Sequence, residues 1–512
     1  MKKGALKVIS LVLTIALAIS LCGCGGANTH PQSSSTVTQN SSSQHTSAEV
    51  SSPLSGGENS SANSMPIFSV NGLLGAITGI FNPSNNNSSK ISSASSKVSS
   101  ASSKVSSASS AVTSSKEEPK PDPRYIFDGS ISLEVLNNYL NRAMTYCQIL
   151  RGNESFADIK NDIIGVGAKY IQRAACNWPP SNWEHGLAAD TKNRLAEIHK
   201  IDPYVIFEAC IFEIVTKSVE KISIPSFVFA EFGIKAEERT FDYEKMLFPD
   251  GYGVNQWGTD SSIPDITRLE TQMFFYYRAC FFMDQGFEAL HLGQTNLIGR
   301  SDTNNAAWTK VIGKIRAYAK KNARRHYVII NGHNPSQNFK GTDGKMLVDF
   351  NAFPMRISVA PGEGDHKPSE LNPQRCVITP GVGDAVYKKN IKGTSPSGWT
   401  TDKYPYLVEV DNWGIMAEKY HNKASSPIWG FDEITWFAVQ PQWYRQKFIE
   451  DLTKQIDSFG ENGHLSIPGK RYTQKVTGVS DATLYFAASK EGNINYFGDL
   501  NFYRDMWNRL KK

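Results

Sequence analysis

From about residue 124 to the end of the chain, short apolar runs alternate with amphipathic stretches in which apolar residues recur every three or four positions. This alternation predicts a parallel sheet whose strands are joined and covered by helices. Eight strands are predicted, which is the order expected of a (β/α)8 barrel, irregular because no long helix is evident after the fifth to seventh strands. The runs are "YIFDGS" from Tyr125, "GAKYIQRAACNW" from Gly167, "YVIFEACIFEIV" from Tyr204, "FEALHLGQ" from Phe287, "HYVIINGHN" from His326, "MLVDFNAF" from Met346, "YLVEVDNWG" from Tyr406 and "ITWFAVQPQ" from Ile434.

Helices are predicted between most of these strands. They are "SLEVLNNYLNRAMTYCQIL" from Ser132, "DTKNRLAEIHKI" from Asp190, "ITRLETQMFFYYRACFFMDQG" from Ile266, "AAWTKVIGKIRAYAKKNARR" from Ala306 and "WYRQKFIEDLTKQIDSFG" from Trp443. The stretch "NGHL" from Asn462 is interpreted as the stop signal of the last helix. An open doubly wound sheet is the main structural alternative, but no GxGxxG-type turn follows an early strand to support a dinucleotide site.

Polar residues occupy every second position of several predicted strands. In a barrel, alternate side chains of a strand point to the interior and to the surrounding helices. Because the helix-facing set should be apolar, the polar set is predicted to face the interior. This set comprises Glu208 of the third strand, Asn331 and His333 of the fifth, Asp349 and Asn351 of the sixth, and Glu409 and Asp411 of the seventh. Arg173 of the second strand is also placed inward, whereas Gln294 and His291 of the fourth strand have opposite parity.

Position along the strand separates these residues further. Strand carboxyl ends carry the chemistry of (β/α)8 barrels, so later residues are the better candidates for substrate contact. These are Asn177, Glu213, Gln294, His333, Asn351, Asp411 and Asn412. Glu208, Asp349 and Glu409 lie deeper, where a structural role is more plausible. Buried carboxylates need hydrogen-bond or ion-pair partners. The cluster therefore implies either a network with side chains such as Arg173 and Asn331 or a solvent-accessible end of the barrel that binds a ligand.

Several carboxylates in an aromatic-rich cleft suit the cleavage of glycosidic bonds. One acid protonates the leaving oxygen, and a second carboxylate acts as nucleophile or activates water. Either Glu409 or Asp411 is predicted to supply one of the two, and the full set of catalytic candidates is Glu409, Asp411, Asp349 and Glu208. Tryptophans just after strands suit sugar faces. The predicted substrate contacts therefore include Trp178, Trp413 and Trp429.

The stretches "FEALHLGQ", "MLVDFNAFP", "PYLVEVDNWG" and "WGFDEITWFAVQP" resemble those of bacterial (β/α)8 proteins of the glycoside-hydrolase type. The resemblance covers most of residues 124–512 and is one of architecture and strand-end chemistry. It implies a carbohydrate substrate but no particular sugar. The large clan of retaining glycosidases usually presents Asn-Glu at the end of the fourth strand. This chain has "LGQT" there, with Gln294 and no acid, so the acid/base residue of that clan is not carried over.

Three other functions remain open. A non-catalytic carbohydrate-binding lipoprotein would keep the aromatic and amide side chains without a proton-transfer pair. A metal-dependent barrel hydrolase could use His291, His333 and Asp349, although the paired HxH expected on its first strand is absent from "YIFDGS". A structural barrel at the cell surface would need neither arrangement. No cofactor and no metal ion is predicted.

The amino-terminal part of the chain has a different character. Three lysines among the first seven residues precede the apolar run "VISLVLTIALAISL", which is typical of an export signal. The following "LCGC" resembles the lipobox of bacterial lipoproteins, and this resemblance implies cleavage before Cys24 and lipidation of that cysteine. Residues 1–24 are therefore assigned to the signal, residues 25–123 to a disordered Ser-rich linker and residues 124–512 to the barrel.

A lipid anchor would place the exported protein on the outer face of the bacterial cell membrane, with the membrane as a partner through the acyl chains. The net charge of +5 is scattered along the chain, so no nucleic acid is expected as a partner. Beyond the signal region the cysteines contain no CxxC pair, and their apolar surroundings predict buried free thiols. These cysteines are Cys147, Cys176, Cys210, Cys280 and Cys376.

Overall fold

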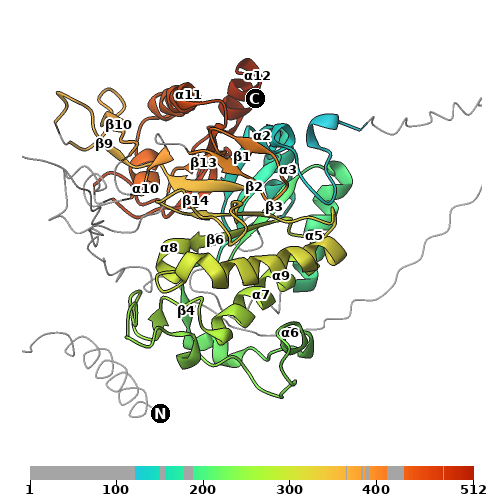
Figure 1. The fold of residues 1–512 in the computed structure, drawn as a ribbon. Helices are drawn as coiled ribbons and strands as arrows, with labels where there is room; N and C mark the ends of the chain where they lie inside the picture. Colours follow the sequence, from blue (N-terminus) through green and yellow to red (C-terminus); the bar gives the residue numbers. More distant parts are fainter. Residues whose placement is uncertain are drawn as a thin grey trace, which may run out of the picture. The chain divides into compact units, whose positions relative to one another are not determined.

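Eight parallel strands form a closed barrel (Figure 1). The computed structural model describes residues 121–149, 156–177, 188–364, 366–381, 384–387, 391–411, 432–476 and 478–512. Each strand pairs in parallel with the next, and β1 also pairs with β14, which closes the sheet. The predicted (β/α)8 barrel is therefore confirmed. In order, the strands are β1 (Ala143–Tyr146), β2 (Tyr170–Ala175), β3 (Ile206–Cys210), β6 (Ala289–Gln294), β7 (Ile329–His333), β8 (Phe350–Pro354), β13 (Tyr406–Glu409) and β14 (Gly463–Tyr472).

Helices cover the outside of the barrel along much of its circumference (Figure 1). Their apolar side chains pack with the outward-facing side chains of the strands to form the main hydrophobic core. Within this shell, the two longest helices on one side, α7 and α9, pack against each other, and α11 packs against β14. The helices are α3 (Phe156–Val166), α5 (Ala188–Ile201), α7 (Leu269–Asp284), α9 (Ala306–Asn322), α11 (Gln442–Phe459) and α12 (Leu500–Arg509).

Between β7 and β13 the described residues form no long helix, which agrees with the predicted irregular side. Two small antiparallel pairs occur there instead: β9 (Ile357–Val359) with β10 (Cys376–Ile378), and β11 (Gly393–Thr394) with β12 (Thr400–Thr401). The remaining short elements are α6 (Ser226–Glu231), α8 (Thr295–Ile298), α10 (Glu433–Ala438), β4 (Val215–Thr216), β5 (Ser261–Ser262), β15 (Leu484–Phe486) and 3-10 turns at Pro123–Tyr125, Lys217–Lys221, Glu244–Met246 and Thr303–Asn305.

A separate apolar cluster fills the amino-terminal end of the barrel. It combines interior side chains from the strand starts, among them Tyr170, Phe350 and Leu407, with Leu136 of α2 (Leu133–Leu140). Burial of these side chains is favourable because it removes a large apolar area from water. Apolar packing therefore seals the end of the barrel that lies opposite to the strand carboxyl ends.

The first and eighth predicted strands are wrong. The run "YIFDGS" packs Tyr125 into the amino-terminal cluster, and β1 comes instead from "AMTY", because α2 ends at Leu140 inside the first predicted helix. The run "ITWFAVQPQ" belongs to α10 and the start of α11, and β14 begins at Gly463 within "NGHL". All residues of α10 are buried, so its continuous apolar run does not distinguish a helix from a strand.

The alternation of the sixth predicted strand is reversed in the structure. In β8, Ala352 lies beside the inward-facing Leu407, whereas Asn351 lies beside Tyr406, which packs into the outer core. Asn351 therefore points away from the barrel interior, and Asp349 shares its parity. Both faces of β8 are buried, so polar residues that find partners on the outer face give the same sequence pattern as polar residues inside.

Several predictions concern parts of the chain outside the described residues. The export signal, Cys24 and the Ser-rich linker up to residue 120 lie there, and they stay predictions. Within the described part, no helix combines the length and the apolar character that crossing a bilayer requires. The five cysteines beyond the signal region are free thiols in the structure, and all except the partly exposed Cys176 are buried as predicted.

Candidate active site

Glu208 and Asn331 occupy the middle of the barrel interior. Glu208 Oε2 accepts hydrogen bonds from Tyr170 Oη at 2.7 Å and from Asn331 Nδ2 at 2.7 Å, and Glu208 Oε1 accepts one from the Arg173 backbone N at 3.1 Å. His291 Nδ1 lies 2.7 Å from Asn331 Oδ1. Burial raises the pKa of Glu208, and these donors act against the rise. Both carboxylate oxygens already have donors, so this group links strands and has little capacity left for a ligand.

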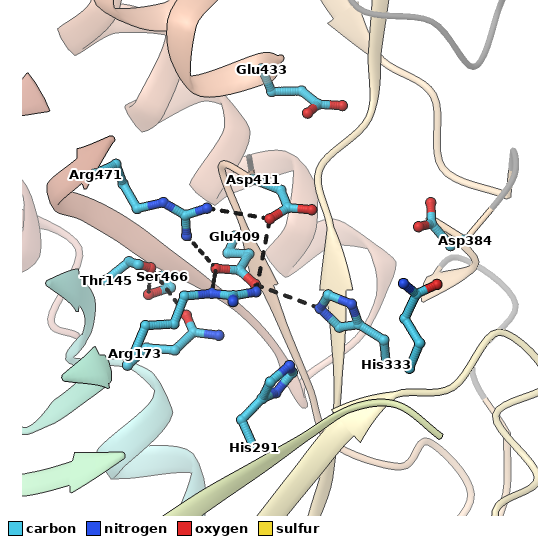
Figure 2. Close-up of polar contacts among 12 residues, drawn as sticks. Thr145, Arg173, His291, His333, Asp384, Glu409, Asp411, Glu433, Ser466 and Arg471 are labelled. Atoms are coloured by element: carbon cyan, nitrogen blue, oxygen red, sulfur yellow. Dashed lines mark hydrogen bonds and ion pairs between the residues drawn. The ribbon is translucent and has the colours of Figure 1, made fainter. Parts of the chain in front are cut away.

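Glu409, the last residue of β13, lies between two arginines (Figure 2). Arg173 Nε donates to Glu409 Oε2 at 2.7 Å and Arg173 Nη2 donates to Oε1, while Arg471 Nη1 donates to Oε2 at 2.6 Å. Burial opposes the ionisation of Glu409, but the two guanidinium groups outweigh it and hold the pKa of this carboxyl well below its usual range. Glu409 is therefore a fixed anion that joins β2, β13 and β14.

A bulge in β2 brings Arg173 to this position. The pairing of β2 with β3 shifts register between Ile171 and Ala175, and Arg173 has a left-handed φ of 59°. The preceding residue, Gln172, accepts a hydrogen bond from Thr145 Oγ1 at 3.1 Å inside the barrel. Two consecutive side chains thus point inward, which a regular strand does not allow. The buried ion pairs of Arg173 offset the cost of its backbone conformation.

Two further carboxyl groups, Asp411 and Glu433, meet at Arg356. Arg356 Nη1 donates to Glu433 Oε1 at 3.0 Å and lies 3.8 Å from Asp411 Oδ2. Its Nε and Nη2 donate to the two oxygens of Asp384, each at 2.9 Å. Asp411 Oδ1 also accepts a hydrogen bond from Arg471 Nη2 at 3.3 Å, which connects this group to the two arginines around Glu409. The group lies beyond the carboxyl ends of the neighbouring strands β8 and β13.

Glu433 is the first residue of α10 and is buried. The helix is capped by Asp432, whose side chain accepts a hydrogen bond from Thr435 N at 2.9 Å. Burial raises the pKa of Glu433 to about 7, and the charge of Asp411 adds to the rise while Arg356 opposes it. Glu433 Oε2 has no hydrogen-bond partner among the described residues. The mouth of the barrel therefore contains a carboxyl group whose pKa is raised into the neutral range, where an ordinary glutamate is fully ionised.

His333, at the end of β7, presents a second polar atom without a hydrogen-bond partner, although it lies within ion-pair distance of Glu409 (Figure 2). Its Nε2 lies 3.6 Å from Glu409 Oε1, which is too long for a hydrogen bond, and it has no other hydrogen-bond partner in the described part of the chain. The ring packs edge-on against His291, with 5.0 Å between ring centroids. Burial lowers the pKa of His333, but the carboxylates of Glu409 and Asp411 outweigh this and raise it.

Gln294 and Asn177 lie at the carboxyl ends of other strands. Gln294 pairs in register with His333 across β6 and β7. Its Nε2 donates to Glu213 Oε1 at 2.7 Å, and its backbone N donates to Glu213 Oε2 at 3.0 Å. Asn177 follows β2 and is buried. These side chains therefore lie at the same carboxyl end of the barrel as Asp411 and its neighbours.

Asp349 and Asn351 do not reach this rim. Asp349 Oδ2 accepts hydrogen bonds from Arg316 Nη2 of α9 at 3.1 Å and from Ile330 N at 2.8 Å, and Tyr327 Oη donates to Oδ1. These partners hold Asp349 at the amino end of β8, facing α9. Asn351 points to the same outer side, as the register of β8 requires.

Sequence reasoning missed four residues of the site: Arg356, Asp384, Glu433 and Arg471. The first two follow β8 in irregular segments without a periodic pattern. Glu433 could have been found, because Asp432 directly before an apolar run is a helix N-cap signal that puts Glu433 in the first turn. The predicted substrate contacts Trp178, Asn412, Trp413 and Trp429 lie outside the described residues.

The described residues contain no group of three or more His, Cys, Asp or Glu side chains that could hold a metal ion. The metal-dependent alternative combined His291 and His333 with Asp349. Those two rings lie together inside the barrel, but Asp349 faces α9 on the outside. The predicted ligand set is therefore not assembled.

No protein-family model and no curated protein sequence matches this chain. Solved structures do show similarity. One is the glycoside hydrolase domain of PelA from Pseudomonas aeruginosa, with 9% identity and a TM-score of 0.28 over 64% of this chain and 94% of that chain. Another is the debranching enzyme of Nostoc punctiforme, with 10% identity and a TM-score of 0.36 over 73% of this chain and 80% of that chain.

A third similar structure is an isomaltulose synthase mutant from Erwinia rhapontici in complex with sucrose. It has 10% identity and a TM-score of 0.29 over 72% of this chain and 83% of that chain. Scores at this level assign no activity to the chain, so its function has to be derived from its own residues.

Proposed function

We propose that this protein hydrolyses glycosidic bonds at the mouth of its barrel, with Glu433 as the general acid and Asp411 as the second carboxylate. The observation that carries the proposal is the environment of Glu433. Its pKa is raised to about 7 by burial and by Asp411, and it shares the Arg356 Nη1 atom with Asp411 at 3.0 and 3.8 Å. A protonated acid beside a second carboxylate is the pair that glycoside hydrolysis requires.

In this mechanism Glu433 donates its proton to the leaving glycosidic oxygen. Asp411, whose side chain is 11% exposed, acts as nucleophile or activates water. Arg356 orients both carboxyl groups, and its bidentate bonds to Asp384 fix its own position. His333 Nε2, which has no hydrogen-bond partner among the described residues, supplies a donor for a sugar hydroxyl.

Glu409 and Glu208 take supporting roles in this proposal. Glu409 is held by two arginines and has no proton to donate, and the oxygens of Glu208 are occupied by Tyr170, Asn331 and the Arg173 backbone. The predicted lipid anchor at Cys24 would display the enzyme on the outer face of a bacterial membrane, where a polysaccharide is the natural substrate. The anchor and the location belong to the proposal.

The test is a hydrolysis screen of the full chain against a panel of polysaccharides, with detection of released reducing ends. We expect turnover of at least one substrate, and a loss of about 10²- to 10⁴-fold in kcat in the isosteric variant Glu433→Gln, because a general acid contributes this much. Glu461→Gln, an exposed glutamate before β14, is the matched control and should retain full activity.

The pH dependence provides a second readout from the same assay. Glu433 must be protonated to act, so activity should fall as the pH rises through about 7, the value to which burial raises its pKa. Binding of a polysaccharide without turnover would show that the protein binds carbohydrate and does not hydrolyse it. Turnover that Glu433→Gln leaves unchanged would refute the assignment of the acid.

A further inference from the structure

Three cysteines lie at the ends of three neighbouring strands. Cys147 follows β1, Cys176 follows β2 and Cys210 is the last residue of β3. The pairing of Ala175 with Ala209 puts the next residue of β2, Cys176, opposite Cys210. All three thiols thus occupy the same level of the barrel, at its carboxyl end.

The three thiols also face the same way. Cys210 pairs with the inward-facing His291, so its side chain points into the barrel, and Cys176 shares this orientation as its register partner. Cys147 is two residues after Thr145, whose hydroxyl bonds to Ser466 inside the barrel. Alternation along a strand therefore turns Cys147 inward as well.

Cys176 is the central member of this group. It packs with Cys210 and Phe212 in one apolar cluster. Hydrogen bonding with Cys176, together with burial, raises the pKa of the Cys147 thiol well above its usual value. Cys176 is partly exposed, whereas Cys147 and Cys210 are buried. Cys176 is therefore the least buried of the three residues, and its thiol lies beside both of the others.

We propose that Cys176 and Cys210 are an oxidation site, which a small disulfide such as oxidised glutathione converts to a disulfide bond. Neighbouring strands are about 4.8 Å apart, inside the range of about 4.4–6.8 Å between Cα atoms that a disulfide bridges. The two cysteine thiols together lose two protons and two electrons, and an S–S bond forms between them. The reagent accepts the protons and electrons, and its own S–S bond breaks to give two molecules of reduced thiol.

The cross-link would join the segments that follow β2 and β3. Arg173 lies three residues before Cys176, and its guanidinium group lies over the ring of Phe212 at 5.7 Å from the centroid. Phe212 follows Cys210 by two residues. Oxidation would therefore fix the part of the mouth from which Arg173 binds Glu409, and this holds whether or not the site hydrolyses sugars.

The test is peptide mapping of the full chain by mass spectrometry, after incubation with oxidised glutathione, acid quenching and alkylation of free thiols. The expected result is a disulfide-linked pair of peptides that contain Cys176 and Cys210. The pair should persist in Cys147→Ser and in Cys280→Ser, a control in the separate helix α7, and it should disappear in Cys176→Ser.

Two results would overturn the proposal. One is the recovery of both Cys176 and Cys210 in alkylated form from the oxidised wild-type chain. The other is a bond from Cys176 to Cys147 in place of Cys210. Both are read from the wild-type protein, so they do not depend on the folding of a variant, and circular dichroism of each variant checks that its disulfide pattern reflects a folded chain.

Discussion

At the scale of single residues, two of the buried carboxyl groups at the barrel mouth have surroundings that shift their pKa values in opposite directions. Glu409 is buried but contacts two arginines, and their charges hold its pKa well below the usual range. Glu433 is also buried, but it has one arginine and a neighbouring aspartate, and its pKa rises to about 7. This division leaves Glu433 as the proton donor and Glu409 as a permanent anion that holds the two arginines, so the second carboxylate of the proposed pair is Asp411.

The role of Asp411 in this division can be tested directly. Its negative charge raises the pKa of Glu433, so Asp411→Asn should move the titration of Glu433 toward the ordinary value of 4.5. The measurement is a carboxyl titration by carbon NMR of the protein labelled at glutamate. The exposed Asp481→Asn should leave the titration unchanged, and an unchanged titration in Asp411→Asn would show that Asp411 does not raise the pKa of Glu433.

Residue-level prediction from the sequence was strongest where a strand has one apolar face. The alternation in "YLVEVDNWG" placed Glu409 on the interior side, where the structure has it. The same logic failed for Asp349, because β8 is buried on both faces and its outer side holds a partnered carboxylate. The alternation of polar and apolar residues shows that the two faces of a strand differ. It does not show which face points into the barrel when both faces are buried.

At the scale of elements, the arginine cluster connects three strands that are far apart in the sequence. Arg173 of β2, Glu409 of β13 and Arg471 of β14 form one buried ion network. The bulge in β2 makes this possible by turning Arg173 inward. A bulge beside a candidate site is a common way to re-aim a functional side chain.

Neutralising the centre of this network should destabilise the fold. Glu409→Gln leaves two buried guanidinium groups facing a neutral amide, and we expect a loss of about 3–5 kcal/mol in the free energy of unfolding, measured by chemical denaturation. The control is Glu450→Gln, which removes a carboxylate that also bonds two cations, Lys454 and Arg509, but near the surface.

The control should cost at most about 1 kcal/mol, because solvent screens such pairs. Equal losses in Glu409→Gln and Glu450→Gln would show that the buried network does not hold the strands together. Glu409 would then again be a candidate for a catalytic carboxylate.

Six of the eight strands were predicted from the sequence, and the two errors share a cause. Short apolar runs of about six to nine residues fit a buried strand and a buried helix equally well. The run in α10 is buried all round, and "AMTY" of β1 continues an amphipathic pattern that the real helix leaves at Leu140. Whether each of these two runs forms a helix or a strand depends on tertiary packing, which the local sequence does not encode.

At the scale of the whole barrel, closure depends on β14, one of the two strands that were not predicted from the sequence. It pairs with β13 on one side and β1 on the other, and it supplies Arg471 to the site. Gly463 begins this strand against the buried ring of Tyr406. A Cβ atom at Gly463 would lie 2.4 Å from Tyr406 Oη, and Tyr406 is stacked on Tyr387 and only 1% exposed.

Gly463→Ala should therefore lower the free energy of unfolding by about 1–3 kcal/mol, because the closed barrel gives the added methyl group no space. The measurement is thermal or chemical denaturation. The matched control is Gly313→Ala on the exposed face of α9, where a Cβ meets nothing within 4 Å and where alanine favours the helix. A stable Gly463→Ala protein would indicate that β13 and β14 pack less closely than the structure shows.

The central claim is that the barrel mouth keeps a protonated carboxyl group near neutral pH. Infrared difference spectroscopy of the full chain against Glu433→Gln, recorded as a function of pH, tests it without any knowledge of the substrate. We expect a carboxylic-acid C=O band from Glu433 that is still present as the pH approaches neutrality and disappears with a midpoint of about 7. A band that titrates at the ordinary glutamate value of 4.5, or the absence of any difference band, would contradict it.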